Sequence, residues 1–159
     1  MQDKAVLIDL DNTLITTRSG KKFPIHSEDW KFIPETLSAI QHYHKNGYMI
    51  VILSNQSGIE EGYVIEDTFI IKLEKICKVL EKELKIPLQS IAYNYCPKID
   101  TFHKMPNAGM VHELALDYEL STNKCTILGS NTDTSVLALK LNIPYLSISE
   151  VINIDWISK

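Results

Sequence analysis

The fold is decided by the stretch AVLIDLDNT, residues 5–13. A short apolar run of this kind is typical of a strand that is buried on both faces of a parallel sheet. Asp9 and Asp11 end the run, and two carboxylates two positions apart lie on the same side of an extended chain. Their mutual repulsion favours a divalent cation, and such a pair could combine nucleophilic attack with proton transfer. The alternative is an Asp/Asn turn that caps a helix.

The rest of the chain alternates apolar runs with helical patterns. Further apolar runs lie at residues 48–53, 91–95, 126–128 and 145–148. Patterns with helical spacing lie at residues 34–46, 67–84, 108–118 and 135–141. This alternation predicts an α/β fold with a doubly wound, mostly parallel sheet and helices on both faces. Ligands of such sheets bind beyond the carboxyl ends of the strands.

Length and composition narrow the class of protein. The chain has 159 residues, which suits a single domain over residues 1–159. Its apolar fraction of 45% and charged fraction of 23% are those of a globular protein, and its net charge of −4 excludes a surface that is basic throughout. No apolar run is long enough to span a membrane. The three cysteines form no C-x-x-C pair, so we expect a soluble, intracellular protein without a disulfide framework.

Two further segments are candidates for binding. Ser54-Asn55-Gln56-Ser57-Gly58 ends the second apolar run, and its hydroxyl, amide and backbone N–H groups suit a phosphate oxygen. An ordinary helix cap followed by a glycine turn is the alternative. The segment 16–31 interrupts the alternation as an inserted loop, and its first part, residues 16–26, is basic and contains no acid. Composition alone favours a solvated loop that turns at Gly20.

The motifs taken together resemble those of the haloacid dehalogenase (HAD) superfamily. DLDNT at 9–13 and SNQSG at 54–58 precede a lysine-containing loop and a loop that begins with glycine. More narrowly, IDLDNTLITTRSGKKFP, Asp29-Trp30 and GYMIVILSNQSGI are similar to the phosphatase domain of the polynucleotide kinase 3′-phosphatase family. The similarity covers roughly residues 5–62 and returns at 138–144. It implies a HAD-like fold without a large cap domain.

The resemblance implies a catalytic role for each aspartate. Asp9 would be the nucleophile that forms an aspartyl-phosphate, and Asp11 would protonate the leaving 3′ hydroxyl and then activate water. Mg²⁺ would be held by the Asp9 carboxylate and the Asp11 backbone carbonyl. Ser54 and Asn55 would bind the phosphoryl oxygens.

The resemblance also gives the inserted loop a role in binding. In the family this loop shapes a channel that admits a DNA 3′ end. The residues expected to contact the strand are Arg18, Lys21, Lys22 and Phe23. A phenylalanine stacked on a base contributes about 1–3 kcal/mol in proteins that bind single strands.

The third and fourth motifs depart from the family pattern. Met105 stands where the family has a lysine, and Lys104, one residue earlier, is the remaining candidate for binding phosphate. Ser130 stands where the family has a metal-binding aspartate, which makes Asp133 the candidate for a third metal ligand. An N-cap for a helix starting near Ser135 is the alternative role of Asp133. The set of four ligands needed for a zinc site is missing from the loop around Cys96 and His103.

The expected function is a Mg²⁺-dependent polynucleotide 3′-phosphatase that cleans DNA 3′ ends for repair, in the nucleus or the cytoplasm. Two alternatives remain open. The first is a small-molecule phosphatase of the same superfamily. The second is a catalytically weakened member that binds DNA ends or a protein, which the replacements at Met105 and Ser130 favour. No phosphate-binding loop of the kinase type is present in the sequence.

Overall fold

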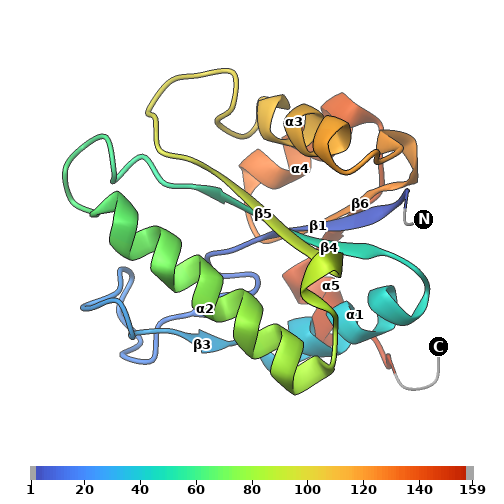
Figure 1. Cartoon of the computed structure of the whole chain (residues 1–159), viewed down its shortest axis with the longest axis horizontal. Coiled ribbons are helices and arrows are strands. Elements are labelled where there is room, and N and C mark those ends of the chain that lie inside the picture. Colours follow the sequence, from blue (N-terminus) through green and yellow to red (C-terminus); the bar gives the residue numbers. More distant parts are fainter. Residues whose placement is uncertain (1–2, 157–159) are drawn as a thin grey trace.

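A five-stranded parallel sheet forms the centre of the molecule in a computed structural model that describes residues 3–156 (Figure 1). The strand order is β5-β4-β1-β6-β7. The strands are β1 (Ala5–Asp9), β4 (Met49–Asn55), β5 (Ile91–Cys96), β6 (Thr126–Gly129) and β7 (Tyr145–Ser147). These are the five runs predicted from the sequence, so the doubly wound, mostly parallel α/β fold is confirmed.

β1 occupies the middle of the sheet. Asp9 is in register with Leu53 of β4, and Ile8 is in register with Leu128 of β6. The chain builds the sheet outward from β1 on the β4 side and then crosses back to add β6 and β7 on the other side. The strand order thus reverses at β1, and open α/β sheets bind ligands at such a switch point.

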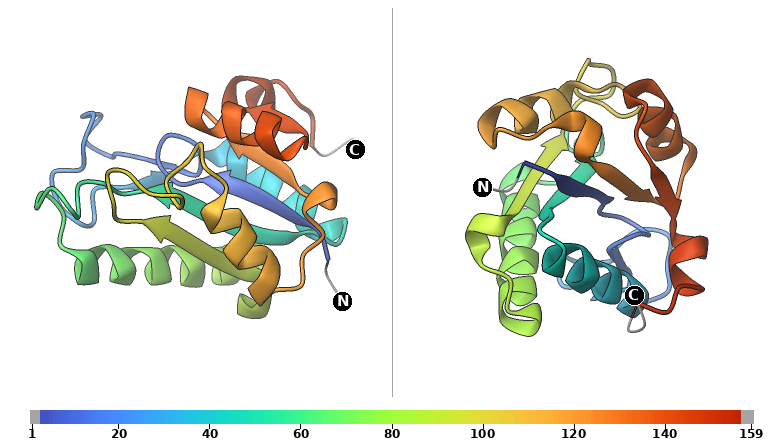
Figure 2. Two further views of the ribbon diagram at one scale, coloured as in Figure 1. Left: turned by 90° about the horizontal axis from the view of Figure 1, so that it is seen from above. Right: turned by 90° about the vertical axis from the view of Figure 1, so that its right-hand side faces the viewer.

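Helices cover both faces of the sheet (Figure 2). The longer helices are α1 (Pro34–Lys45), α2 (Glu66–Leu84), α3 (Gly109–Asp117) and α4 (Thr132–Leu141). Three short helices complete the set: α5 (Ile148–Ile152), η1 (Leu88–Ser90) and η2 (Thr122–Lys124). α1 and α2 lie on one face, and α3 and α4 lie on the other. No helix among the described residues is both long and apolar enough to cross a membrane.

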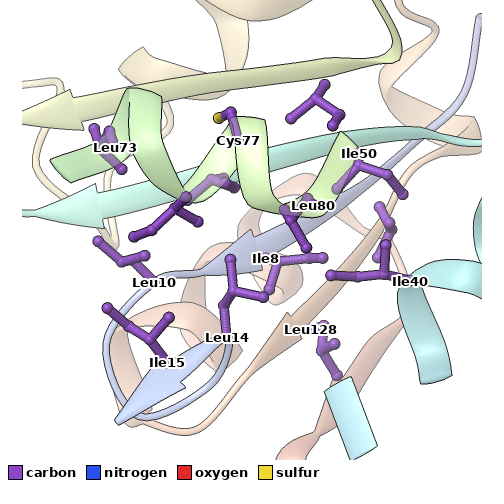
Figure 3. Close-up of a cluster of buried hydrophobic side chains, with 14 of the residues drawn as sticks. Ile8, Leu10, Leu14, Ile15, Ile40, Ile50, Leu73, Cys77, Leu80 and Leu128 are labelled. Carbon is purple, nitrogen blue, oxygen red and sulfur yellow. The ribbon is translucent and has the colours of Figure 1, made fainter. Parts of the chain in front are cut away.

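Alternate residues of β1 enter two separate hydrophobic clusters. Val6 and Ile8 pack in the cluster on the side of α1 and α2, part of which is drawn in Figure 3. Ala5 and Leu7 pack in the cluster on the side of α3 and α4. Because successive side chains of a strand point to opposite faces, every position of β1 is buried, and the apolar run in the sequence follows from this.

The inserted loop is anchored by one buried carboxylate. The loop runs between two short antiparallel strands, β2 (Ile15–Thr16) and β3 (Lys31–Phe32). Asp29 is 2% exposed and accepts hydrogen bonds from the Ile25 backbone N–H and from the backbone N–H and hydroxyl of Ser19. These bonds, that of Ile25 first, lower the pKa of Asp29 to about 2. The segment is therefore a loop with a fixed internal structure.

Gly129 ends β6 against α4 without room for a side chain. A Cβ atom at this position would come within 2.6 Å of the Thr134 Cβ and closer still to its hydroxyl. Thr134 is fully buried and bonds to Asn131. We therefore expect Gly129→Ala to lower the free energy of unfolding by about 1–3 kcal/mol, as overpacking of a filled core does. Denaturant unfolding checks this, with Leu139→Ala, at a 79% exposed position of the same helix, as control. Equal stability of the two variants would contradict it.

Candidate active site

The segments that follow β1, β4, β5 and β6 meet at the carboxyl edge of the sheet, on the left of the view in Figure 1. Side-chain hydrogen bonds join them. Thr13 after β1 donates to the Ser130 hydroxyl after β6 at 2.9 Å, and Gln56 after β4 donates to Asp11 at 2.9 Å. Asn55 at the end of β4 bonds to the backbone of Met105 after β5. The edge is thus one connected polar site.

Asp9 is the buried member of the aspartate pair. It is 6% exposed, and its Oδ2 accepts a hydrogen bond from the Asn131 side-chain amide at 2.8 Å. Burial and the neighbouring Asp11 carboxylate raise the pKa of Asp9 to about 7, against the lowering effect of the Asn131 hydrogen bond. Asp9 therefore holds a charge that the folded protein compensates only in part.

Asp11 lies at the solvent side of the pair. Asp11 is exposed as a residue. Nearby protein atoms nevertheless displace water from its carboxyl group, and this desolvation raises the pKa of Asp11. Two groups act in the opposite direction: the positive charge of Lys72 on α2 and the hydrogen bond from Gln56. Asn12, the next residue, adopts a left-handed conformation with φ of 60°, which turns the chain back after the pair. Asp11 is placed between the buried carboxylate and the solvent, as an acid–base group requires.

Asn131 is a site residue that the sequence analysis missed. It is the N-cap of α4, and its Oδ1 accepts the Thr134 backbone N–H at 3.0 Å. Since the oxygen faces the helix, the amide nitrogen must face Asp9. The sequence did hold a signal, because asparagine is among the best N-cap residues and here directly follows the glycine-led motif. The alternative role of Asp133 as N-cap is wrong, because α4 begins at Thr132 and Asp133 lies in its first turn.

Two side chains at the end of β4 have different partners: Ser54 bonds to Gln56, which also bonds to Asp11, and Asn55 bonds to the loop after β5. The buried Ser54 hydroxyl accepts a hydrogen bond from Gln56 at 2.7 Å. The Asn55 amide instead donates to the Met105 carbonyl and accepts from the Met105 N–H, each at 2.9 Å. Met105 is 2% exposed, and the half-buried Lys104 precedes it. Phosphate binding by Ser54, Asn55 and Lys104 stays a prediction, and the observed role of the Asn55 side chain is to hold this loop.

The donor set at Asp9 suits a hard cation such as Mg²⁺. The partly uncompensated Asp9 carboxylate and the charge of Asp133, which also acts to raise the pKa of Asp9, favour a divalent ion. Within residues 3–156, no three His, Cys, Asp or Glu side chains cluster closely enough to form a metal site of their own. Mg²⁺ commonly keeps several waters and takes only one or two protein carboxylates, so the residues present fit it.

The predicted DNA-binding residues separate into two groups. Arg18 donates its Nε–H to the Trp30 carbonyl at 2.7 Å and lines a hollow beside α2. Lys21, Lys22 and Phe23 lie at the exposed tip of the loop, where the Lys22 ammonium is 5.4 Å from the centre of the Phe23 ring. Phe23 is 70% exposed. The structure thus brings only Arg18 to the side of the loop that faces α2.

Comparison with known proteins identifies the family. The family model for polynucleotide kinase 3 phosphatase matches residues 4–135. The chain belongs to this family. It is a HAD-type phosphatase whose sequence resembles the polynucleotide kinase 3′-phosphatase domain, as the motifs predicted.

Individual relatives match different shares of this chain. An uncharacterized 20.8 kDa protein of Autographa californica nuclear polyhedrosis virus is 30% identical over 72% of this chain, which spans 58% of the viral protein. D-glycero-alpha-D-manno-heptose-1,7-bisphosphate 7-phosphatase of Campylobacter jejuni is 26% identical over 90% of the chain and 80% of its own length. The bifunctional polynucleotide phosphatase/kinase of Schizosaccharomyces pombe is 34% identical over 49% of the chain and 19% of its own length.

A solved structure supports the fold. The D,D-heptose 1,7-bisphosphate phosphatase of B. bronchiseptica, complexed with magnesium and phosphate, aligns with a TM-score of 0.73 and 19% identity. The alignment covers 89% of this chain and 78% of that one. At this identity the likeness concerns the fold alone.

The hydrogen bond from Asn131 to Asp9 is open to direct test. Asn131→Ala removes the helix cap and the Asp9 contact, whereas Asn131→Ser keeps a cap acceptor that is too short to reach Asp9. We expect Ala to cost about 1 kcal/mol of unfolding free energy and Ser to cost little. Both variants should lose on the order of tenfold or more in phosphate release, because a hydrogen bond to a charged group contributes about 1.5–3 kcal/mol. Full activity of Asn131→Ser would show that the contact is dispensable.

Proposed function

We propose that this chain is a phosphomonoesterase that removes the 3′-phosphate from single-stranded DNA ends. The observation that carries the catalytic part is the Asp9 and Asp11 pair at the end of the central strand. The Asn131 and Gln56 side chains hold one aspartate each. A buried carboxylate with a second, solvent-facing carboxylate beside it supplies a nucleophile and a proton carrier to the same phosphoester.

The reaction would proceed in two displacement steps. An Asp9 carboxylate oxygen attacks phosphorus, and the bond from phosphorus to the 3′ oxygen breaks as Asp11 donates a proton to that oxygen. Asp11 then takes a proton from water, and the water oxygen attacks the phosphorus of the aspartyl-phosphate. Inorganic phosphate leaves, and Asp9 is regenerated. The hydrogen bond from Asn131 would fix the orientation of the attacking carboxylate in both steps.

Magnesium would be held by the Asp9 carboxylate and the Asp11 backbone carbonyl, with Asp133 close enough to add negative charge. When bound, Mg²⁺ supplies positive charge to the phosphoryl oxygens. This supply matters here because Met105 brings no charge to the site, which leaves Lys104 and Lys72 as the candidate protein cations.

Two lines of support point to different substrates. The family match over residues 4–135 and the ordered inserted loop that carries Arg18 support a polynucleotide end. The named relatives that match most of the chain support a small sugar phosphate, since the heptose-bisphosphate phosphatase matches 90% of it and the polynucleotide phosphatase/kinase 49%. A small-molecule phosphatase is therefore the second candidate function.

Phosphate release from two substrates separates these candidates. The substrates are a single-stranded oligonucleotide with a 3′-phosphate and a sugar bisphosphate, each with and without Mg²⁺. We expect Mg²⁺-dependent release from the oligonucleotide, with kcat/KM at least about tenfold above that for the sugar, which corresponds to about 1.4 kcal/mol of transition-state discrimination. Asp9→Asn, which keeps the shape but cannot attack, should abolish release from both substrates.

The reverse preference would assign the protein to small molecules. Release from neither substrate, by protein that is folded by circular dichroism and binds the oligonucleotide, would assign it to a binding role.

A further inference from the structure

Two exposed tips project from the end of the molecule at which the carboxyl edge of the sheet lies (Figure 1, Figure 2). One is the tip of the inserted loop, residues 21–25 with the sequence KKFPI, which we call the basic tip. The other is the turn between β4 and α2, residues 60–65 with the sequence EEGYVI, which we call the acidic tip. In each tip, two like charges are followed by an aromatic residue and, two positions later, by an isoleucine. The tips are therefore similar in apolar content and opposite in charge.

Each tip holds two apolar side chains in solvent. Phe23 and Ile25 on the basic tip are 70% and 58% exposed, and Tyr63 and Ile65 on the acidic tip are 83% and 73% exposed. Single apolar side chains on a surface are ordinary, but several that gather at one end of a soluble protein mark an interaction site.

The basic tip is held at both ends. The Thr17 hydroxyl donates to the Lys21 carbonyl at 2.6 Å, where the tip begins. The backbone N–H of Ile25, where the tip ends, donates to the buried Asp29 carboxylate at 3.0 Å. Because both ends are fixed, the Phe23 side chain between them stays in solvent.

The acidic tip is fixed by its own backbone. The N–H groups of Tyr63 and Val64 both donate to the Gly58 carbonyl, at 2.8 and 3.1 Å, and Gly62 makes the turn with φ of 86°. The half-buried Val64 packs against the core, which leaves Tyr63 and Ile65 on either side of it exposed. A surface that is ordered before it binds loses little conformational entropy on association.

The charges of the two tips do not neutralise each other within one chain. Among residues 3–156, no ion pair joins the basic tip to the acidic tip, and Glu60 instead lies 3.9 Å from the Lys98 ammonium. Lys21, Lys22 and Glu61 are exposed. A second copy of the chain offers an acidic tip to each basic tip, and it therefore complements both tips at once.

We propose that the two tips form the interface of a two-fold symmetric dimer of this chain, in which the basic tip of one protomer lies against the acidic tip of its partner. A two-fold interface uses the same surface on both protomers, so each basic tip meets an acidic tip and every contact occurs twice. The apolar side chains supply contact area, and the charges set which tips pair. The proposal is independent of the proposed function, because the interface includes neither Asp9 nor Asp11.

Sedimentation velocity over a series of protein concentrations at low salt tests for the dimer. We expect wild type to associate reversibly with a dissociation constant on the order of 10 µM, and more weakly at high salt. Tyr63→Ser should raise this constant about tenfold or more, because an aromatic contact is lost twice. The matched control is Leu116→Ser on α3, at a position that is also 83% exposed, and it should dimerise as wild type does.

A charge swap tests which tips pair. Lys22→Glu alone and Glu61→Lys alone each place like charges at both contacts of a homodimer, so each should raise the dissociation constant about tenfold or more. An equimolar mixture of these two variants again has opposite charges at both contacts. The mixture should therefore dimerise as wild type does, and so should the double variant that carries both substitutions.

Three results would overturn the proposal when circular dichroism shows that the variants are folded. The first is a wild type that stays monomeric up to about 0.1 mM. The second is equal dimerisation of Tyr63→Ser and Leu116→Ser. The third is a mixture of Lys22→Glu and Glu61→Lys that associates no better than either variant alone. A monomeric wild type that binds a single-stranded oligonucleotide less tightly after Lys22→Glu would assign the basic tip to nucleic acid instead.

Discussion

Asp9 carries a carboxyl group into the space where β1 meets β4, β6 and the start of α4, and its burial is opposed by the loss of hydration of the charged form. Polar and charged groups around the aspartate pair offset part of this loss of hydration. Asn131 donates to one oxygen of Asp9, Gln56 orients the neighbouring Asp11, and Lys72 adds positive charge on the solvent side. Because the compensation is incomplete, the pKa of Asp9 stays at about 7.

The loops around this pair are held largely by neutral contacts. Thr13 bonds to Ser130, and the Asn55 amide forms two hydrogen bonds with the backbone of Met105. Asn131 caps α4 and also donates a hydrogen bond to Asp9. Relative to the family pattern, Met105 removes a positive charge and Ser130 removes a negative one, so the two replacements leave the net charge of the site unchanged.

The inserted loop is held in one conformation next to α2. Asp29 organises it from within, and the pair between Glu28 and Lys75 connects it to α2. The loop therefore presents a fixed surface beside α2, and the hollows between them are lined by Glu28, Trp30 and Lys75.

The strands of the parallel sheet, the burial of the first strand on both faces and the aspartates at its end are all predicted from the amino-acid sequence, because they follow from local periodicity and from the alternation of side chains along a strand. The sequence also singled out the segment around Ser54 and the basic inserted loop as candidates for binding. The polar groups that contact the aspartates become known only once the strands and helices are packed together. Asn131 lies 122 positions from Asp9, and Asn55 lies 50 positions from Met105, so their contacts depend on how strands and helices pack. Asn131 rather than Asp133 is the N-cap because of where α4 begins, and Arg18 rather than Lys21 or Lys22 lies beside α2 because of how Asp29 folds the loop. No local pattern specifies either outcome.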